Sequence, residues 1–345
     1  MRQQSFGHLR DRREAQLFTL TNSAGASLSV TNYGCIITAL CMPDRDGALA
    51  NVVLGYDTLA AYEHDTAVMG AFVGRFANRI ADGHVRIGGR DYQLAKNKGP
   101  HHLHGGAMGF HKHLWAAELA TSDQGAQIVL KRTSPDGEEN YPGELQTAVV
   151  YTLTEGNAVV MDVTATTDRS TIVNVTQHSY FNLSGSHGSV LDHELLINAD
   201  QVLCTDQDLI PSGEMKSVEG TPFDFRRFRR VGEAIDDPDP LLVSGHGYDH
   251  CFVLNSGDQL CARLRHQASG RELTVTTDEP GLQLYTGNWL SGPHPRRSGL
   301  CLETQHFPDS PHHPSFPSTA LEPGEVFRSR TVYQFSVMPD LAGKP

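Results

Sequence analysis

The 345-residue sequence lacks several patterns that would assign it to a familiar class of protein. No stretch approaches the roughly 18 consecutive apolar residues of a membrane-spanning helix. The first residues carry charges but no apolar run of the length that a signal peptide needs. These absences lead us to expect a cytoplasmic protein that has no membrane partner.

Positive charge is also scarce. The 28 Lys and Arg residues stand against 40 Asp and Glu, which gives a formal net charge of −12. Such a chain is a poor electrostatic partner for nucleic acids, so we expect no nucleic-acid partner. One dense basic run, residues 225–230 (FRRFRR), follows Asp224 and precedes an acidic stretch. We interpret this run as a surface segment.

Common catalytic and cofactor-binding signatures are missing as well. No serine stands in a GxSxG motif, no GxGxxG follows a strand pattern, and no GxxxxGK[ST] is present. An α/β-hydrolase and a dinucleotide or phosphate cradle are therefore not predicted. The six cysteines are scattered without a CxxC pair, which is typical of reduced, mostly buried thiols.

Strand patterns dominate the sequence. Hairpins are predicted within residues 84–94, 146–167 and 249–266, the last turning at 256–258, with further strands within 271–288 and 331–338. Helical patterns are limited to single turns near 59–65 and 229–235. This spacing predicts an all-β sandwich or barrel. The segment 205–247 is long and polar, but the strand patterns on its two sides are similar, so we expect one domain over residues 1–345.

A glutamate stands inside an apolar strand pattern in residues 299–311 (GLCLETQHFPDSP). The period-two alternation of a strand places Leu300 and Leu302 on one face, and Cys301 and Glu303 on the other. A carboxylate beside a thiol and between two leucines is not an ordinary surface charge. It is either buried and paired, or functional.

Four other stretches carry polar residues that a plain strand or turn does not require. They are residues 70–83 with Arg75 and Asn78, 97–106 with His101, His102 and His104, 174–185 with His178 and Tyr180, and 245–254 with Asp249. Each has an ordinary structural interpretation when taken alone, such as a buried ion pair or a turn residue. The histidines of 97–106 raise the alternative of a metal site, but no Cys or carboxylate follows at ligand spacing, so we expect no metal. Together the five stretches indicate one site.

At these stretches the sequence resembles the aldose 1-epimerases, also called galactose mutarotases. The motifs GRFANRI, LHGG, HSYFNLSG, YDHCFVL, LQLYTGN and CLETQHFPDSP occur in family order, and the resemblance spans nearly the whole chain. The resemblance implies a large antiparallel β-sandwich, the galactose mutarotase-like supersandwich, with a sugar cleft on one face. It also implies cofactor-free interconversion of the α and β anomers of free hexoses such as glucose and galactose.

The resemblance assigns roles to individual residues. Glu303 matches the general base and His178 the general acid. His104, Arg75 and Asp249 match residues that hold the sugar. This chemistry requires an ionised Glu303 and a protonated His178, whereas burial among apolar neighbours raises the pKa of a carboxyl group.

Three further residues are expected to contact the substrate. Asn78 follows Arg75 closely, and Tyr180 and Trp289 are candidates to cover the apolar face of a pyranose. We assign the neighbouring Phe181 to core packing. Because His101, His102 and Trp289 depart from the family pattern, the preferred hexose stays open.

Two alternative functions remain. A hexose 6-phosphate epimerase would need a cluster of cations, for which FRRFRR and Arg296–Arg297 are candidates, but the motifs favour unphosphorylated sugars. A non-catalytic sugar-binding module on the same scaffold would be expected to lose Glu303 or His178, and both are present. Both a monomer and a homodimer are compatible with the sequence.

Overall fold

Three large antiparallel sheets form the computed structural model, which describes residues 1–185, 188–257 and 259–339. The N-terminal sheet contains, in spatial order, β1 (Arg2–His8), β2 (Glu14–Thr21), β3 (Ser27–Thr31), β4 (Ile36–Pro43) and β5 (Leu49–Asn51). Its neighbouring strands are also neighbours in sequence, as expected for hairpin-connected strands.

The second sheet has nine strands and draws on distant parts of the chain. Its order is β11 (Ala116–Ser122), β12 (Gly125–Ser134), β13 (Leu145–Thr154), β14 (Ala158–Thr167), β28 (Phe327–Val337), β24 (Arg271–Thr277), β23 (Leu260–Arg265), β18 (Glu194–Ile197) and β21 (Arg229–Arg230). The C-terminal strand β28 lies between β14 and β24 and so joins the two halves of this sheet.

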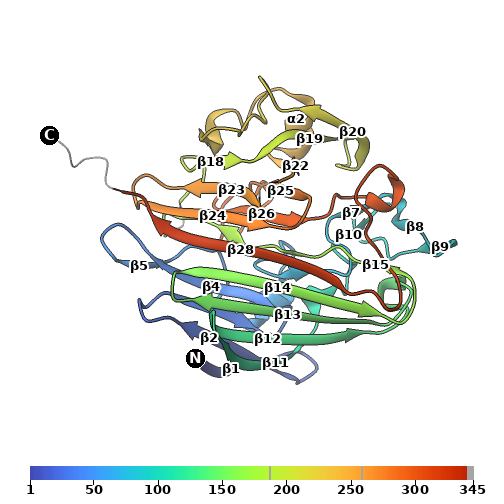
Figure 1. Ribbon diagram of the computed structural model, residues 1–345, viewed down its shortest axis with the longest axis horizontal. Helices are drawn as coiled ribbons and strands as arrows, with labels where there is room; N and C mark the ends of the chain where they lie inside the picture. The colour runs from blue at the N-terminus through green and yellow to red at the C-terminus, as the bar shows by residue number, and fades with distance from the viewer. Residues whose placement is uncertain (186–187, 258, 340–345) are drawn as a thin grey trace.

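The third sheet has six strands and carries most of the candidate site. Its order is β17 (Tyr180–Phe181), β26 (Leu300–Gln305), β25 (Gly281–Tyr285), β22 (Asp249–Leu254), β19 (Ala199–Thr205) and β20 (Pro211–Ser217). Figure 1 shows the nine-stranded sheet across the front, with the N-terminal sheet (blue) behind β12–β14, and with β22, β19 and β20 of the third sheet at the top of the view.

Four two-stranded sheets connect these layers. They pair β7 (Arg79–Ile80) with β10 (His102–Leu103), β6 (Phe72–Val73) with β16 (Thr176–Gln177), β15 (Thr171–Ile172) with β27 (Ala320–Leu321), and β8 (His84–Ile87) with β9 (Arg90–Gln93). Two short α-helices are present in the described residues, α1 (Leu59–His64) and α2 (Pro240–Gly245). No helix within these residues combines the length and apolarity needed to cross a membrane.

One buried cluster runs between the layers. Phe18 of β2, Val149 of β13, Leu273 of β24 and Leu302 of β26 all belong to it. Burying such apolar side chains stabilises the fold by about 1.5–3 kcal/mol for each. The all-β sandwich predicted from the sequence is confirmed, and the extent of the single domain stays a prediction.

The predicted hairpins have different outcomes. Those within 146–167 and 84–94 are confirmed, because β13 pairs with β14 and β8 with β9. The hairpin within 249–266 is wrong: β22 lies beside β25 and β19, whereas β23 lies beside β18 and β24 in another sheet. A glycine-containing turn also suits a crossing between layers, and local pattern does not choose the partner. Asp258, within the predicted turn, is outside the described residues.

The helical predictions are largely confirmed. Helix α1 occupies 59–64, and a single 3₁₀ turn occupies Val231–Glu233. Helix α2 was not predicted, although Asp239 caps it by accepting a hydrogen bond from the Leu241 N–H, and Pro240 occupies its first turn.

Candidate active site

A cavity of about 680 Å³ opens on the face of the third sheet that points away from the main core. This volume is in the range of small-molecule sites. Its wall combines charged, polar and aromatic side chains from separate parts of the sequence. Among them are Asn78, Arg79, His104, His178, Tyr180, Asp249, Tyr285, Trp289 and Glu303.

Glu303 reaches this cavity from the middle of β26. Leu300 and Leu302 on the other face of that strand belong to the main core, so the predicted alternation is confirmed. The Glu303 side chain is 2% exposed, and its Oε2 atom has no hydrogen-bond partner in the described part of the chain. Burial raises the pKa of Glu303 well above its usual value, and the nearby Asp249 adds to the rise while Arg79 opposes it.

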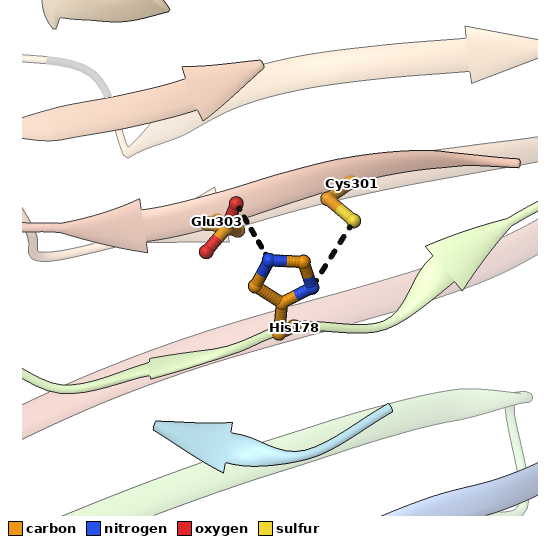
Figure 2. A group of neighbouring side chains, drawn as sticks. All are labelled: His178, Cys301 and Glu303. Atoms are coloured by element: carbon orange, nitrogen blue, oxygen red, sulfur yellow. Dashed lines mark hydrogen bonds and ion pairs between the residues drawn. The ribbon is translucent and has the colours of Figure 1, made fainter. Parts of the chain in front are cut away.

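His178 faces Glu303 from the segment between β16 and β17. Its backbone N–H donates to the Ala71 carbonyl and its carbonyl accepts from the Gly70 N–H, which fixes the segment against the start of β6. The imidazole Nε2 lies 3.6 Å from Glu303 Oε1, and Nδ1 lies 3.5 Å from Cys301 Sγ (Figure 2). Burial lowers the pKa of His178 to about 4, against the opposing effect of its own carbonyl.

The two pKa shifts have a common cause and opposite directions. Burial disfavours the carboxylate of Glu303 and the imidazolium of His178 alike. Before a sugar enters, the pair therefore favours the neutral form, with its one mobile proton on Glu303. The chemistry implied by the family resemblance requires the reverse arrangement, with Glu303 ionised and His178 protonated. The two forms differ only by transfer of that proton.

Asp249 stands at the start of β22 and accepts hydrogen bonds at both of its carboxylate oxygens. Arg79 Nη2 donates to Oδ2 at 3.4 Å, and Gln283 Nε2 donates to Oδ1 at 2.6 Å. The Arg79 guanidinium also donates to Asn78 Oδ1 at 3.2 Å. The result is a connected set of donors and acceptors along one wall of the cavity, suited to a ligand with several hydroxyl groups.

His104 approaches the cavity from the loop that follows β10. Its Nδ1 accepts from the Asn78 N–H at 3.1 Å, so Nε2 carries the proton of the neutral ring and is a donor. Burial, together with the charges of His178 and Arg79, lowers the pKa of His104 well below its usual value. A Cβ on Gly105 would lie 1.8 Å from the Gly74 carbonyl oxygen, so this glycine serves close packing of the main chain.

Arg75 does not lie at the cavity, contrary to the expectation from sequence. Its side chain is 2% exposed, and its guanidinium donates to the carbonyls of Pro142 and Gly143 at 3.0 and 2.9 Å and to Ser134 Oγ at 2.6 Å. These hydrogen bonds hold the Arg75 guanidinium inside the fold. Arg79, four residues further on, lines the cavity instead.

The three histidines of 97–106 have different hydrogen-bond partners. His101 Nδ1 accepts from the Asp82 N–H, and His102 contacts the Ala95 carbonyl and the Tyr141 hydroxyl. They therefore do not converge on one point as metal ligands would.

One other group has ligand atoms within 4.8 Å of one another in the described residues: His178, Cys301 and Glu303. The thiol and the carboxylate are nearest to different imidazole nitrogens, one on Nδ1 and one on Nε2. A metal ion binds an imidazole through one nitrogen, so the arrangement suits proton transfer better than coordination.

Some of the predicted aromatic residues line the cavity, and another packs in the main core. Tyr180 and Trp289 line the cavity. Tyr180 anchors its hydroxyl on the Ala67 carbonyl at 2.8 Å, and Trp289 is 65% exposed with its ring centroid 4.4 Å from that of His246. Phe181 packs in the main core, as expected.

Sequence reasoning did not assign Arg79, Gln283, Tyr285 or Cys301 to the site. A usable signal existed for Gln283, since a polar residue inside the apolar strand GLQLY has the same character as Glu303 in LCLET. No sequence signal distinguished Arg79 from Arg75, because the two arginines share one motif and have similar neighbours.

Known proteins match this chain over most of its length. The family model described as Aldose 1-epimerase matches residues 16–334. The galactose mutarotase of Mus musculus is 46% identical over 90% of this chain and 91% of its own, and the aldose 1-epimerase of Escherichia coli (strain K12) is 36% identical over 93% and 95%. The crystal structure of galactose 1-epimerase from Lactobacillus acidophilus NCFM has a TM-score of 0.89 at 30% identity, covering 98% of this chain and 99% of that one. The chain therefore belongs to the aldose 1-epimerase family, and it is an isomerase that interconverts the anomers of aldoses.

Proposed function

We propose that the protein interconverts the α and β anomers of free aldohexoses, galactose and glucose among them, by acid–base ring opening at Glu303 and His178. The observation that carries the proposal is the contact between the two groups. Glu303 Oε1 and His178 Nε2 lie 3.6 Å apart, both side chains are nearly fully buried, and both line the cavity. A sugar in the cavity that contacts both groups places its reacting atoms within reach of a base and an acid.

The proposed reaction moves two protons and breaks one bond. Glu303 takes the proton of the anomeric hydroxyl while His178 gives its Nε2 proton to the ring oxygen, and the bond between that oxygen and the anomeric carbon breaks. The open-chain aldehyde rotates by about half a turn about the bond between C1 and C2. Both protons then return as the ring closes on the other face, so no atom is gained or lost. Each positioned group contributes about 10²- to 10⁴-fold.

The neutral resting pair is compatible with this reaction. Hydrogen bonds donated by sugar hydroxyls to a carboxylate favour its ionised form. The sugar therefore favours transfer of the mobile proton from Glu303 to His178, which lie next to each other. An imidazolium whose pKa is about 4 is a strong acid toward the ring oxygen.

The other cavity residues are proposed to hold the hydroxyl groups. Asp249 supplies acceptors, whereas Arg79, Asn78 and His104 supply donors. Tyr180, together with Trp289 at the rim, offers aromatic surface to the C–H face of a pyranose.

The charges of the cavity favour unphosphorylated sugars over hexose 6-phosphates. Two cations, Arg79 and Lys98, line the cavity together with two acidic residues besides Glu303, namely Asp208 and Asp249. Two of the arginines considered for a phosphate site have acidic partners: Arg226 pairs with Asp224, and Arg297 with Asp236. We expect a higher kcat/KM for α-D-glucose than for α-D-glucose 6-phosphate when optical rotation is followed after dissolution. An equal or higher value for the phosphate would contradict this assignment.

The pH dependence of kcat/KM follows from the two shifted pKa values. The pair of Glu303 and His178 is active when it holds one mobile proton, on either residue. A second proton binds as the pH falls through the lowered pKa of His178, about 4, and the last proton leaves as the pH rises through the raised pKa of Glu303. We therefore expect a bell-shaped profile whose acid limb lies near pH 4. An acid limb near the ordinary histidine value of 6.5, or a flat profile, would count against the pair.

A further inference from the structure

Cys301 lies behind the imidazole of His178, outside the wall of the cavity. It is completely buried, and its sulfur is 3.5 Å from Nδ1, the ring nitrogen that faces away from Glu303. Cys301 and Glu303 stand two residues apart on β26 and so point to the same side of the strand. One strand thus supplies a neighbour to each nitrogen of the imidazole (Figure 2).

The register of the sheet fixes the position of the thiol. Cys301 is paired with Tyr180 of β17 on one side and with Tyr285 of β25 on the other. Tyr180 follows His178 by two residues, so the pairing of β17 with β26 also sets the distance from imidazole to sulfur.

The protonation states of Glu303 and His178 indicate what the contact between Cys301 and His178 does. Transfer of the mobile proton from Glu303 to His178 requires that Nε2 be free to accept it, so the neutral ring must then carry its own proton on Nδ1. That N–H needs an acceptor, and the Cys301 sulfur is in place to be one. Burial and the nearby Glu303 carboxyl raise the pKa of the Cys301 thiol well above its usual value, so the sulfur stays a neutral, weak acceptor.

We propose that Cys301 is a positioning residue that keeps Nδ1 of His178 protonated, so that the proton exchanged in the reaction is always the one on Nε2, facing the cavity. A carboxylate in this place would also hold the ring, but it would raise the basicity of the imidazole. Neutral sulfur holds the ring without that effect and leaves His178 a strong acid. The inference rests on the proposed function for the role of His178.

Several other groups face His178 and act on its titration. The rings of His104 and Tyr285 pack against it, Tyr180 contacts it from its own segment, and Asp249 and Asp65 raise its pKa at longer range. None of them changes identity when Cys301 is replaced. A shift of the acid limb in a Cys301 variant therefore reports the contact with Nδ1.

The test compares Cys301→Ala and Cys301→Ser with Cys261→Ala, which removes an equally buried thiol from β23 in the nine-stranded sheet. The first readout is the ¹⁵N NMR spectrum of the histidine side chains, in which His178 is identified by its loss in a His178→Gln protein. We expect the Nδ1–H form of His178 in the wild type and in Cys261→Ala, and a gain of the Nε2–H form in Cys301→Ala.

The second readout is kinetic. We expect Cys301→Ala to lose about 10- to 100-fold in kcat with little change in KM. Cys301→Ser should recover part of this loss, because its hydroxyl accepts a hydrogen bond from the Nδ1–H group, and its acid limb should move to higher pH. A Cys301→Ala or Cys301→Ser protein with the wild-type tautomer and acid limb would overturn the proposal. Absence of epimerase activity in the wild type would refute the proposed function instead, since the NMR readout does not depend on turnover.

Discussion

We expect the Glu303→Gln protein to lose about 10²- to 10⁴-fold in kcat for mutarotation, with a smaller change in KM. Glutamine has nearly the shape of glutamate but cannot take the proton of the anomeric hydroxyl. The hydrogen bonds that hold the other hydroxyls involve Asp249, Arg79, Asn78 and His104, and the substitution leaves these residues unchanged. Initial rates from optical rotation at several sugar concentrations separate kcat from KM.

Thermal unfolding is the control for this substitution. Glu303 is 1% exposed, and its ionised form is disfavoured by burial. A neutral amide in its place relieves that cost, so we expect the melting temperature to stay the same or rise. A folded Glu303→Gln protein with wild-type kcat would refute the assignment of Glu303 as the base.

The second large effect concerns stability. We expect the Arg75→Met protein to be less stable by about 3–5 kcal/mol, because the substitution leaves several buried acceptors without a partner. Chief among these are the carbonyls of Pro142 and Gly143, to which the Arg75 guanidinium now donates. The free energy of unfolding, measured in urea at a temperature where both proteins fold, tests this value.

Arg79→Met is the matched control. It removes the same charge four residues further along, at a side chain that lines the cavity and contacts Asp249. We expect Arg79→Met to raise KM for galactose with a smaller loss of stability than Arg75→Met. If Arg75→Met instead kept the full stability and raised KM, Arg75 would hold the sugar as the motif resemblance implied.

The contrast between these arginines shows where the sequence stops being informative. Arg75 and Arg79 stand among the same small and apolar residues, and a motif does not say which of two side chains turns toward a cavity. Glu303 was different, because strand alternation alone separates it from the core leucines. The direction of a side chain is therefore predictable on a regular strand, but much less so in the irregular segment that joins β6 to β7.

The pairing of strands that are distant in sequence was likewise not predictable from local sequence patterns. The hairpin β13–β14 follows from its short turn, whereas β22 and β23 are neighbours in sequence that enter different sheets. The contact of Cys301 with His178 has the same origin. It depends on the pairing of β17 with β26, two segments more than 100 residues apart, and a buried cysteine in a strand has no distinguishing pattern of its own.

The central claim is that Glu303 and His178 open the sugar ring by proton transfer, so the bond that breaks is the one to the ring oxygen. The most direct test follows the anomeric ¹³C NMR signals of α-D-galactose labelled with ¹³C and ¹⁸O at C1. The account predicts that the protein accelerates conversion to the β anomer and that the ¹⁸O label stays on C1 through many turnovers. Conversion no faster than in buffer, or loss of the label in step with turnover, would contradict it.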